Sequence, residues 1–159
     1  MAAVGLAAAL SAPARAADEP PVVHNEIATA ERYCAEHGGK LREDPGFPRV
    51  LDINGDGRED WILDFSKFHC ANSIPPEPYC GSGGCNLMIF LWKEDSEWTV
   101  GFEETVQKYR LVRRGRRLNL QVWIAGNMCG KTDAESCKEE YRFEATKLVR
   151  VGGRARRRP

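Results

Sequence analysis

The sequence predicts an α+β fold, mainly β, in which one N-terminal helix packs on an antiparallel sheet of about five to seven strands. Three observations predict it. Apolar residues recur at helical spacing in one early segment, residues 25–37. After this segment, short apolar runs, several of them alternating with polar residues, are separated by turn residues, as in strands. Six cysteines in 159 residues indicate a single disulfide-bonded domain.

The helix is expected to begin and end at recognisable signals. Asn25 is the candidate N-cap, and Ile27, Ala30 and Cys34 fall near one face at helical spacing. Two glycines at 38–39 stop the helix. A helix with one apolar face must pack on another element, and the sheet is the natural partner.

The rest of the chain is predicted to be β. The expected strands are 49–51, 61–65, 87–92, 98–102, 109–112, 118–124 and 141–151. In 118–124 the apolar residues alternate with polar ones, so one face of this strand is buried. Trp123 falls on the opposite face, which makes it the candidate ligand-binding aromatic residue.

The ends of the chain predict export and a single domain. Residues 1–16 are largely apolar and finish in a small-x-small cleavage site, which is typical of a signal peptide. We expect a flexible lead at 17–24, one globular domain at 25–151 and a basic disordered tail at 152–159. No stretch is apolar for long enough to predict a transmembrane segment.

An even number of cysteines in a small exported domain predicts a disulfide framework. Spacing favours two local pairs, Cys80 with Cys85 and Cys129 with Cys137, which leaves Cys34 for Cys70. Sequence alone does not fix this connectivity. A zinc site is disfavoured, because the chain has neither C-x₂-C pairs nor clustered histidines.

The most specific pattern in the chain is D-I-N-G-D-G-R-E-D at 52–60. Its side-chain oxygens recur at positions one, three, five and nine, from Asp52, Asn54, Asp56 and Asp60. Calcium takes about six to eight hard oxygen ligands, so this spacing suits Ca²⁺. The alternative is an Asn-Gly and Asp-Gly turn that binds nothing, since both dipeptides are common in hairpins.

This loop resembles those of FG-GAP and VCBS-type repeats, and the first part of an EF-hand or dockerin loop. That resemblance implies Ca²⁺ ligation by the four side chains and by the backbone carbonyl of Arg58. The EF-hand pattern is incomplete, because its twelfth position needs a bidentate Glu and is Leu63 here. The strand-to-strand version of the loop is therefore the better match.

The whole chain also resembles small exported proteins of proteobacteria that combine an N-G-D-G loop with a C-G-x-G-G-C turn, here residues 80–85. That resemblance implies export and a shared fold, and it implies no activity.

The function predicted is therefore that of a small periplasmic or secreted calcium-binding protein, non-enzymatic, with a structural Ca²⁺ site. No catalytic residue is assigned, because no nucleophile elbow, H-E-x-x-H, P-loop or dinucleotide fingerprint occurs. One alternative is an inhibitor or binding module that acts on a cell-wall hydrolase through the 69–86 loop. Another is a calcium-dependent hydrolase.

Two basic clusters, 113–117 and 154–158, leave the choice of partner open. They could contact an anionic surface or simply be solvated. Nucleic-acid binding is not expected, because neither a recognisable module nor stacking aromatic residues accompany the charges. A protein partner remains unknown.

Overall fold

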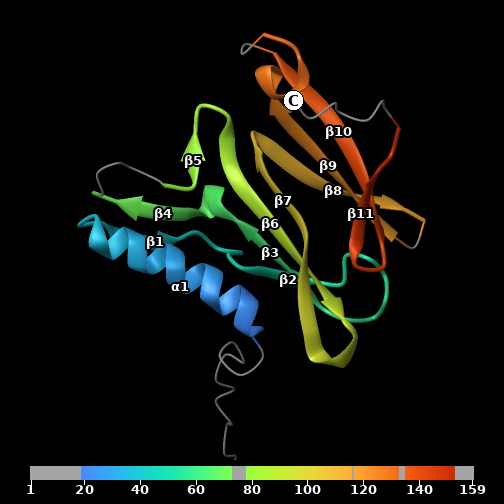
Figure 1. The fold of residues 1–159 in the computed structure, drawn as a ribbon, viewed down its shortest axis with the longest axis horizontal. Helices are drawn as coiled ribbons and strands as arrows, with labels where there is room; N and C mark the ends of the chain where they lie inside the picture. The colour runs from blue at the N-terminus through green and yellow to red at the C-terminus, as the bar shows by residue number, and fades with distance from the viewer. Residues whose placement is uncertain (1–18, 73–77, 116, 133–134, 153–159) are drawn as a thin grey trace, which may run out of the picture.

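The computed structural model describes residues 19–72, 78–115, 117–132 and 135–152 (Figure 1). The predicted signal peptide at 1–16 lies outside the described residues, as does all but the first residue of the predicted tail at 152–159. Part of the 69–86 loop, residues 73–77, is also outside them.

The described residues form one α-helix, eleven strands and three short 3₁₀ helices. In chain order these elements are α1 (Pro21–Glu36), β1 (Lys40–Glu43), β2 (Arg49–Leu51), β3 (Asp60–Asp64), η1 (Phe65–Lys67), β4 (Phe68–Ala71), β5 (Cys80–Gly81), β6 (Gly84–Lys93), η2 (Glu94–Ser96), β7 (Glu97–Val106), β8 (Lys108–Arg114), β9 (Arg117–Ala125), η3 (Gly126–Cys129), β10 (Ser136–Glu144) and β11 (Lys147–Arg150).

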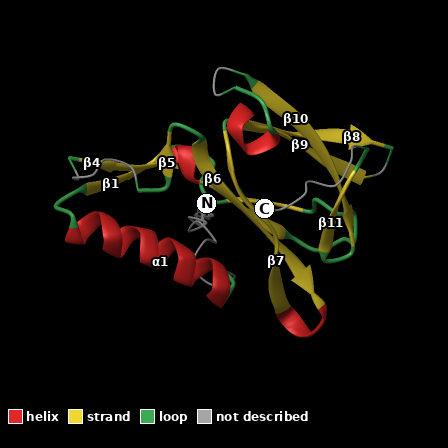
Figure 2. Cartoon of the chain, turned by 45° about the horizontal axis from the view of Figure 1, so that its top comes forward, coloured by secondary structure: helices red, strands yellow, loops and turns green. Residues whose placement is uncertain are grey.

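The strands form three antiparallel sheets. Strands β1 and β4 make a two-stranded sheet. The central sheet contains β2, β3, β5, β6 and β7, and β6 pairs with β3 and β5 as well as with β7. The outer sheet has the order β11-β10-β9-β8. Figure 2 shows α1 on one side of the molecule and the outer sheet on the other.

The prediction of one helix packed on a single sheet is wrong. The chain is mostly β, and its strands divide among three sheets. The expected strand 141–151 is instead a hairpin of β10 and β11, which turns at Ala145 with a φ of 50°. Alternation along each strand shows which face is buried but not which strands pair, and pairing determines the number of sheets.

Two apolar clusters make the central sheet a middle layer. One cluster joins α1 to one face of the sheet and contains Val23, Ile27, Ala30, Trp61, Leu63, Met88 and Phe90, with Phe47, Phe65 and Phe68. The other joins the opposite face to the outer sheet and contains Ile53, Ile62, Leu87, Ile89, Leu91, Phe102, Val106, Leu120, Val122, Ile124 and Phe143. The nearly continuous apolar run in β6 follows from burial on both faces.

Helix α1 begins earlier than the sequence predicts. Its N-cap is Pro20, with Pro21 in the first helical position, where the missing N–H costs nothing. The buried stripe of the helix includes Val23, one turn before Ile27. Residues 21–24, expected in a flexible lead, are therefore helical, because Val23 extends the face that packs on the central sheet.

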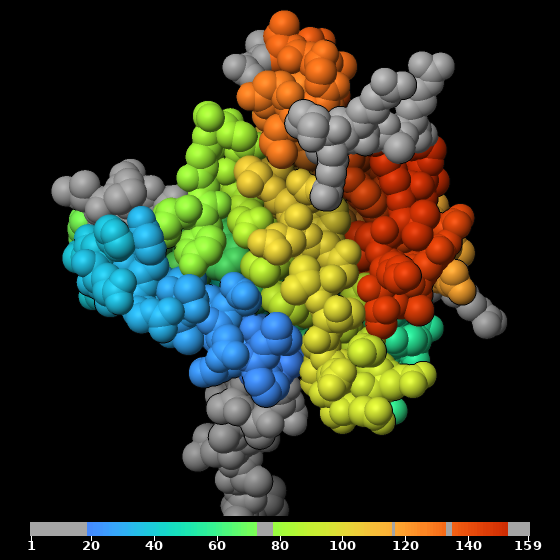
Figure 3. All heavy atoms as spheres, viewed as in Figure 1, coloured from blue at the N-terminus to red at the C-terminus, as the bar shows by residue number. Residues whose placement is uncertain are grey.

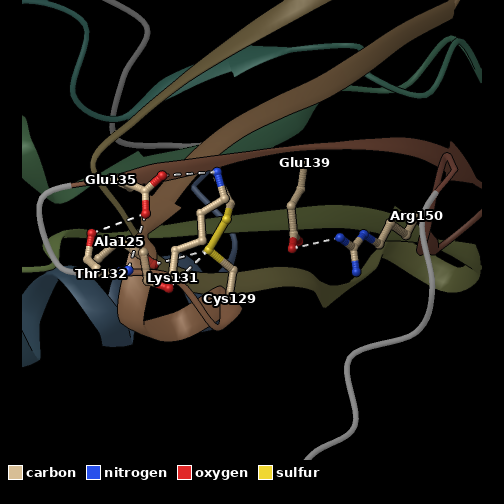
Figure 4. Close-up of a disulfide and its surroundings, with 9 residues drawn as sticks. Ala125, Cys129, Lys131, Thr132, Glu135, Glu139 and Arg150 are labelled. Atoms are coloured by element: carbon tan, nitrogen blue, oxygen red, sulfur yellow. Dashed lines mark hydrogen bonds and ion pairs between the residues drawn. A yellow bond between two sulfur atoms is a disulfide. The ribbon is translucent and has the colours of Figure 1, made fainter.

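The six cysteines, all within the described residues, form the three bridges Cys34–Cys70, Cys80–Cys85 and Cys129–Cys137. These are the pairs that the spacing favours. The first ties α1 to β4, and the second closes the β5–β6 turn. Figure 4 shows the third bridge, beside which Glu135 accepts a hydrogen bond from Thr132 Oγ1 at 3.1 Å.

On the face drawn in Figure 3, strand β7 (yellow) lies between α1 (blue) and the β10–β11 hairpin (red). One face of the outer sheet packs on the central sheet. Among the described residues, no strand or helix covers its other face. The candidate metal loop joins β2 to β3 and reaches the β10–β11 turn, where Asn54 Nδ2 donates to the Ala145 carbonyl at 3.2 Å.

Candidate metal site

The 52–60 loop connects the antiparallel strands β2 and β3, as the strand-to-strand form of the motif predicts. Gly55 and Gly57 have φ values of 80° and 84°. These left-handed conformations are open to glycine without the steric cost that a Cβ brings. Both glycines therefore allow the backbone to turn tightly between β2 and β3.

Asp60 is the most deeply buried acidic residue of the loop and is 0% exposed. Its Oδ2 accepts a hydrogen bond from the Ile53 N–H at 3.0 Å, and its Oδ1 accepts one from the Trp92 N–H at 2.9 Å. One carboxyl group thus connects the loop to the end of β6. Burial raises the pKa of Asp60, the two amides lower it, and the charge of Asp56 raises it further.

The other loop oxygens accept hydrogen bonds from amides of the loop itself. Asp52 is exposed, and its carboxylate accepts from Gly55 N–H at 2.7 Å and Gly57 N–H at 2.9 Å. Asn54 is 8% exposed, and its Oδ1 accepts from Asp56 N–H at 2.9 Å. These bonds curl the backbone into consecutive Asx turns.

Asp56 completes the rim of the loop. Its Oδ1 accepts from Arg58 N–H at 2.7 Å, and its Oδ2 accepts from Asn54 Nδ2 at 2.9 Å. The Arg58 guanidinium lies over the Trp92 ring, 4.7 Å from its centroid. Among the described residues, Asp52, Asp56 and Asp60 form no ion pair with any basic side chain.

The fit of the loop to a metal ion is partial. Within the described residues, no three His, Cys, Asp or Glu side chains lie close enough together to hold an ion. The structure therefore brings the predicted ligands into one turn but does not gather their carboxylates around a point. Sequence reasoning also missed the contact from Asp60 to Trp92, since the two residues are 32 positions apart and meet only through strand pairing.

No protein-family model, curated protein or solved structure matches the chain.

Trp123, the predicted ligand-binding residue, is half-buried on the outer sheet, on the face away from the core. Three cationic groups surround its ring: Lys108 Nζ is 4.6 Å from the centroid, Arg110 Cζ 5.4 Å and Lys138 Nζ 5.6 Å. The sequence does not predict this cluster, because the three cations come from β8 and β10 and their proximity depends on strand register.

A polar network continues from Trp123 along the same face and converges on Glu140. The Asn119 amide donates to Oε1 at 2.7 Å, the Arg114 guanidinium donates to Oε1 at 3.2 Å, and the Gln121 amide donates to Oε2. These donors lower the pKa of Glu140 from 4.5 to about 2. Arg110 Nε in turn donates to Gln121 Oε1 at 2.7 Å, which links the network to the cations around Trp123.

Replacing Glu140 by Gln should destabilise the fold by about 1–2 kcal/mol at neutral pH, because a charged acceptor of three donors becomes a neutral one. The folded-state pKa is lowered, so Glu140 stabilises the fold above its ordinary value of 4.5, and this contribution is lost as the pH falls toward about 2. Urea unfolding at pH 7 and pH 2 should show a difference between wild type and variant at pH 7 that shrinks at pH 2. A difference of the same size at both pH values would contradict this role.

A cavity of about 600 Å³ is lined by Tyr79, Glu103, Glu104 and residues of the β5–β6 turn. A second cavity, of 390 Å³, adjoins the metal loop and is lined by Asp56, Trp92 and residues of the β10–β11 turn.

Proposed function

We propose that this chain is a small exported, non-enzymatic protein in which the 52–60 loop binds one structural Ca²⁺. One observation carries the proposal: the loop holds three carboxylates without an ion pair among the described residues, and one of them, Asp60, is fully buried. Buried charges in proteins are usually paired or coordinate a metal. Burial raises the pKa of Asp60, the charge of Asp56 adds to this, and a divalent cation would offset the repulsion between the two carboxylates.

The donor chemistry of the loop suits calcium. An ionised carboxylate has about four lone-pair positions, so an oxygen that already accepts an amide N–H can also ligate a cation. Asn54 Oδ1 and the Arg58 carbonyl would add hard oxygen ligands. Because the carboxylates do not converge in the described structure, binding must draw Asp52 and Asp56 toward Asp60.

A structural role follows from what the loop touches. Asp60 holds the end of β6 through Trp92, and Asn54 holds the β10–β11 turn through Ala145. Ile53, next to Asn54 in the loop, is 0% exposed and belongs to the cluster shared by the central and outer sheets. An ion that rigidifies the loop would therefore stabilise contacts of both sheets.

The three disulfides support export, because such bonds persist in oxidising compartments. A periplasmic or secreted location is part of the proposal. In the described part of the chain, no helix is both long and apolar enough to cross a membrane.

The test is the thermal midpoint of residues 17–159 in Ca²⁺, in EGTA and in Mg²⁺. At a calcium concentration about a hundred times the Kd, linkage predicts about 2.7 kcal/mol of added stability. For a domain of this size that is a rise of roughly 5–10 °C. Mg²⁺ should give a much smaller rise, because it needs near-octahedral geometry and keeps its waters.

Two variants locate the site. Asp56→Ala should abolish the calcium-dependent rise, and Glu31→Ala, which removes an exposed carboxylate from α1, should leave it intact. The proposal fails if wild type shows equal midpoints in Ca²⁺ and EGTA, or if Asp56→Ala responds to calcium as wild type does.

A further inference from the structure

The solvent-facing side of the outer sheet carries many cations and few carboxylates. Residues directly opposite each other in an antiparallel pair share a face, and the register places Lys108 and Lys138 on either side of Trp123. We call this surface the Trp123 face. Its exposed charged residues are the cations Lys108, Arg110, Arg114, Arg117, Lys138, Arg142 and Lys147 and the carboxylate Glu144, with the half-buried carboxylate Glu140.

Each carboxylate of the Trp123 face pairs with an arginine of the same face. Glu140 pairs with Arg114 at 3.2 Å, and Glu144 accepts from Arg142 Nε at 2.6 Å. Both pairs lie away from Trp123 along the strands. At Trp123 itself, Lys108 and Lys138 form no ion pair among the described residues.

The cations at Trp123 are held in a defined arrangement. Adjacent strands are about 4.8 Å apart, so Lys108 and Lys138 start from backbone positions roughly 10 Å apart, with the indole between them. Contact with the ring positions their ammonium groups and the Arg110 guanidinium. The nearest carboxylate of the face, Glu140, is paired with Arg114, so the three cations at Trp123 leave an excess of positive charge that attracts an anion.

We propose that the Trp123 face binds an acidic polysaccharide, whose carboxylate or sulfate groups pair with Lys108, Arg110 and Lys138. The chemistry of the face favours this occupant. An extended polyanion can cross Trp123 on β9 and contact the cations of β8 and β10 on both sides of it at once. Charge complementarity, not apolar burial, supplies the attraction.

Other polyanionic partners fit less well. The exposed large apolar residues of the described chain are Val100, Met128 and Val151, and none lies within β8, β9, β10 or β11. A folded protein partner would need an apolar core to its interface, and a membrane surface would need inserted apolar side chains. Single-stranded nucleic acid stacks successive bases on aromatic residues, and Trp123 is the one aromatic residue that these register pairs place on the face.

The test measures binding of residues 17–159 to heparin and to polygalacturonate by calorimetry at about physiological salt, with neutral dextran as the control ligand. Wild type should bind both acidic chains and not dextran, and its affinity should fall as salt rises. The double variant K108Q/K138Q should bind at least five-fold more weakly. Its matched control, R32Q/K40Q, removes two exposed charges from α1 and β1 and should bind as wild type does.

Three results would overturn the proposal: no binding of either acidic polysaccharide, equal weakening in K108Q/K138Q and R32Q/K40Q, or tighter binding to a single-stranded oligonucleotide or to anionic lipid vesicles than to both polysaccharides. Thermal midpoints of both variants, measured alongside, separate lost binding from lost folding. The Trp123 face shares no residue with the 52–60 loop. Binding measured with and without calcium therefore distinguishes a failure of this proposal from a failure of the calcium proposal.

Discussion

Asp60→Ala should be among the most destabilising single substitutions in the chain, with an expected loss of about 3–5 kcal/mol. The carboxyl group is 0% exposed and accepts the N–H groups of Ile53 and Trp92. Alanine would leave both donors without that acceptor, at about 1–3 kcal/mol each. Urea unfolding in EGTA measures the loss of these hydrogen bonds separately from any loss of bound calcium.

The matched control for Asp60 is Asp52→Ala. Asp52 also accepts two backbone N–H groups, from Gly55 and Gly57, but it is exposed, so water can replace it. We expect a loss of about 1 kcal/mol or less in EGTA. If the two variants lost equal stability, burial of Asp60 would not be the reason that the loop depends on it.

Removing the Cys34–Cys70 bridge with the double variant Cys34→Ala/Cys70→Ala should cost about 4 kcal/mol. The two residues are 36 positions apart, so the bridge restricts a long segment of the unfolded chain. Both cysteines are buried, and a Cβ on Gly39 would lie 2.3 Å from Cys70 Sγ, so the backbone packs closely on this bridge. Urea unfolding gives the stability, and hydrogen exchange should show α1 and β4 losing protection first.

The short bridge provides the comparison. Cys80 and Cys85 are 5 positions apart, so the double variant Cys80→Ala/Cys85→Ala should lose only about 2 kcal/mol. The main effect of this variant should be a change in the shape of the β5–β6 turn, which lines the 600 Å³ cavity, while the free energy of unfolding changes less. A larger loss from the short bridge than from the long one would contradict the chain-entropy explanation of both.

Local features of this protein follow from its sequence because they depend on neighbouring residues. The glycines of the 52–60 loop adopt the left-handed conformations that the motif requires. The run 87–92 lies within β6, and residues 87–91 are buried because apolar side chains on both faces of the strand pack into the two clusters. The bridges Cys80–Cys85 and Cys129–Cys137 close within short segments, which left Cys34 and Cys70 to pair with each other.

The start of α1 shows the limit of a local signal. Asn25 is a good N-cap by residue type, yet the helix begins at Pro21. The gain from burying Val23 against the central sheet exceeds what a polar cap offers, since burying a Val contributes about 1.5–3 kcal/mol and a cap typically about 1 kcal/mol. Tertiary packing therefore decides the boundary.

The sequence by itself determined the mainly extended backbone, the helix near the N-terminus and the turn with its alternate oxygens. Its cysteine spacing favoured the three observed bridges without fixing them. The tertiary structure alone decided that the strands form three sheets, that Asp60 connects the loop to Trp92, and that Lys108 and Lys138 flank Trp123. The physical reason is common to all three. Each depends on strand pairing and register, which are set by how the apolar faces of different strands are buried together, and no single segment specifies this.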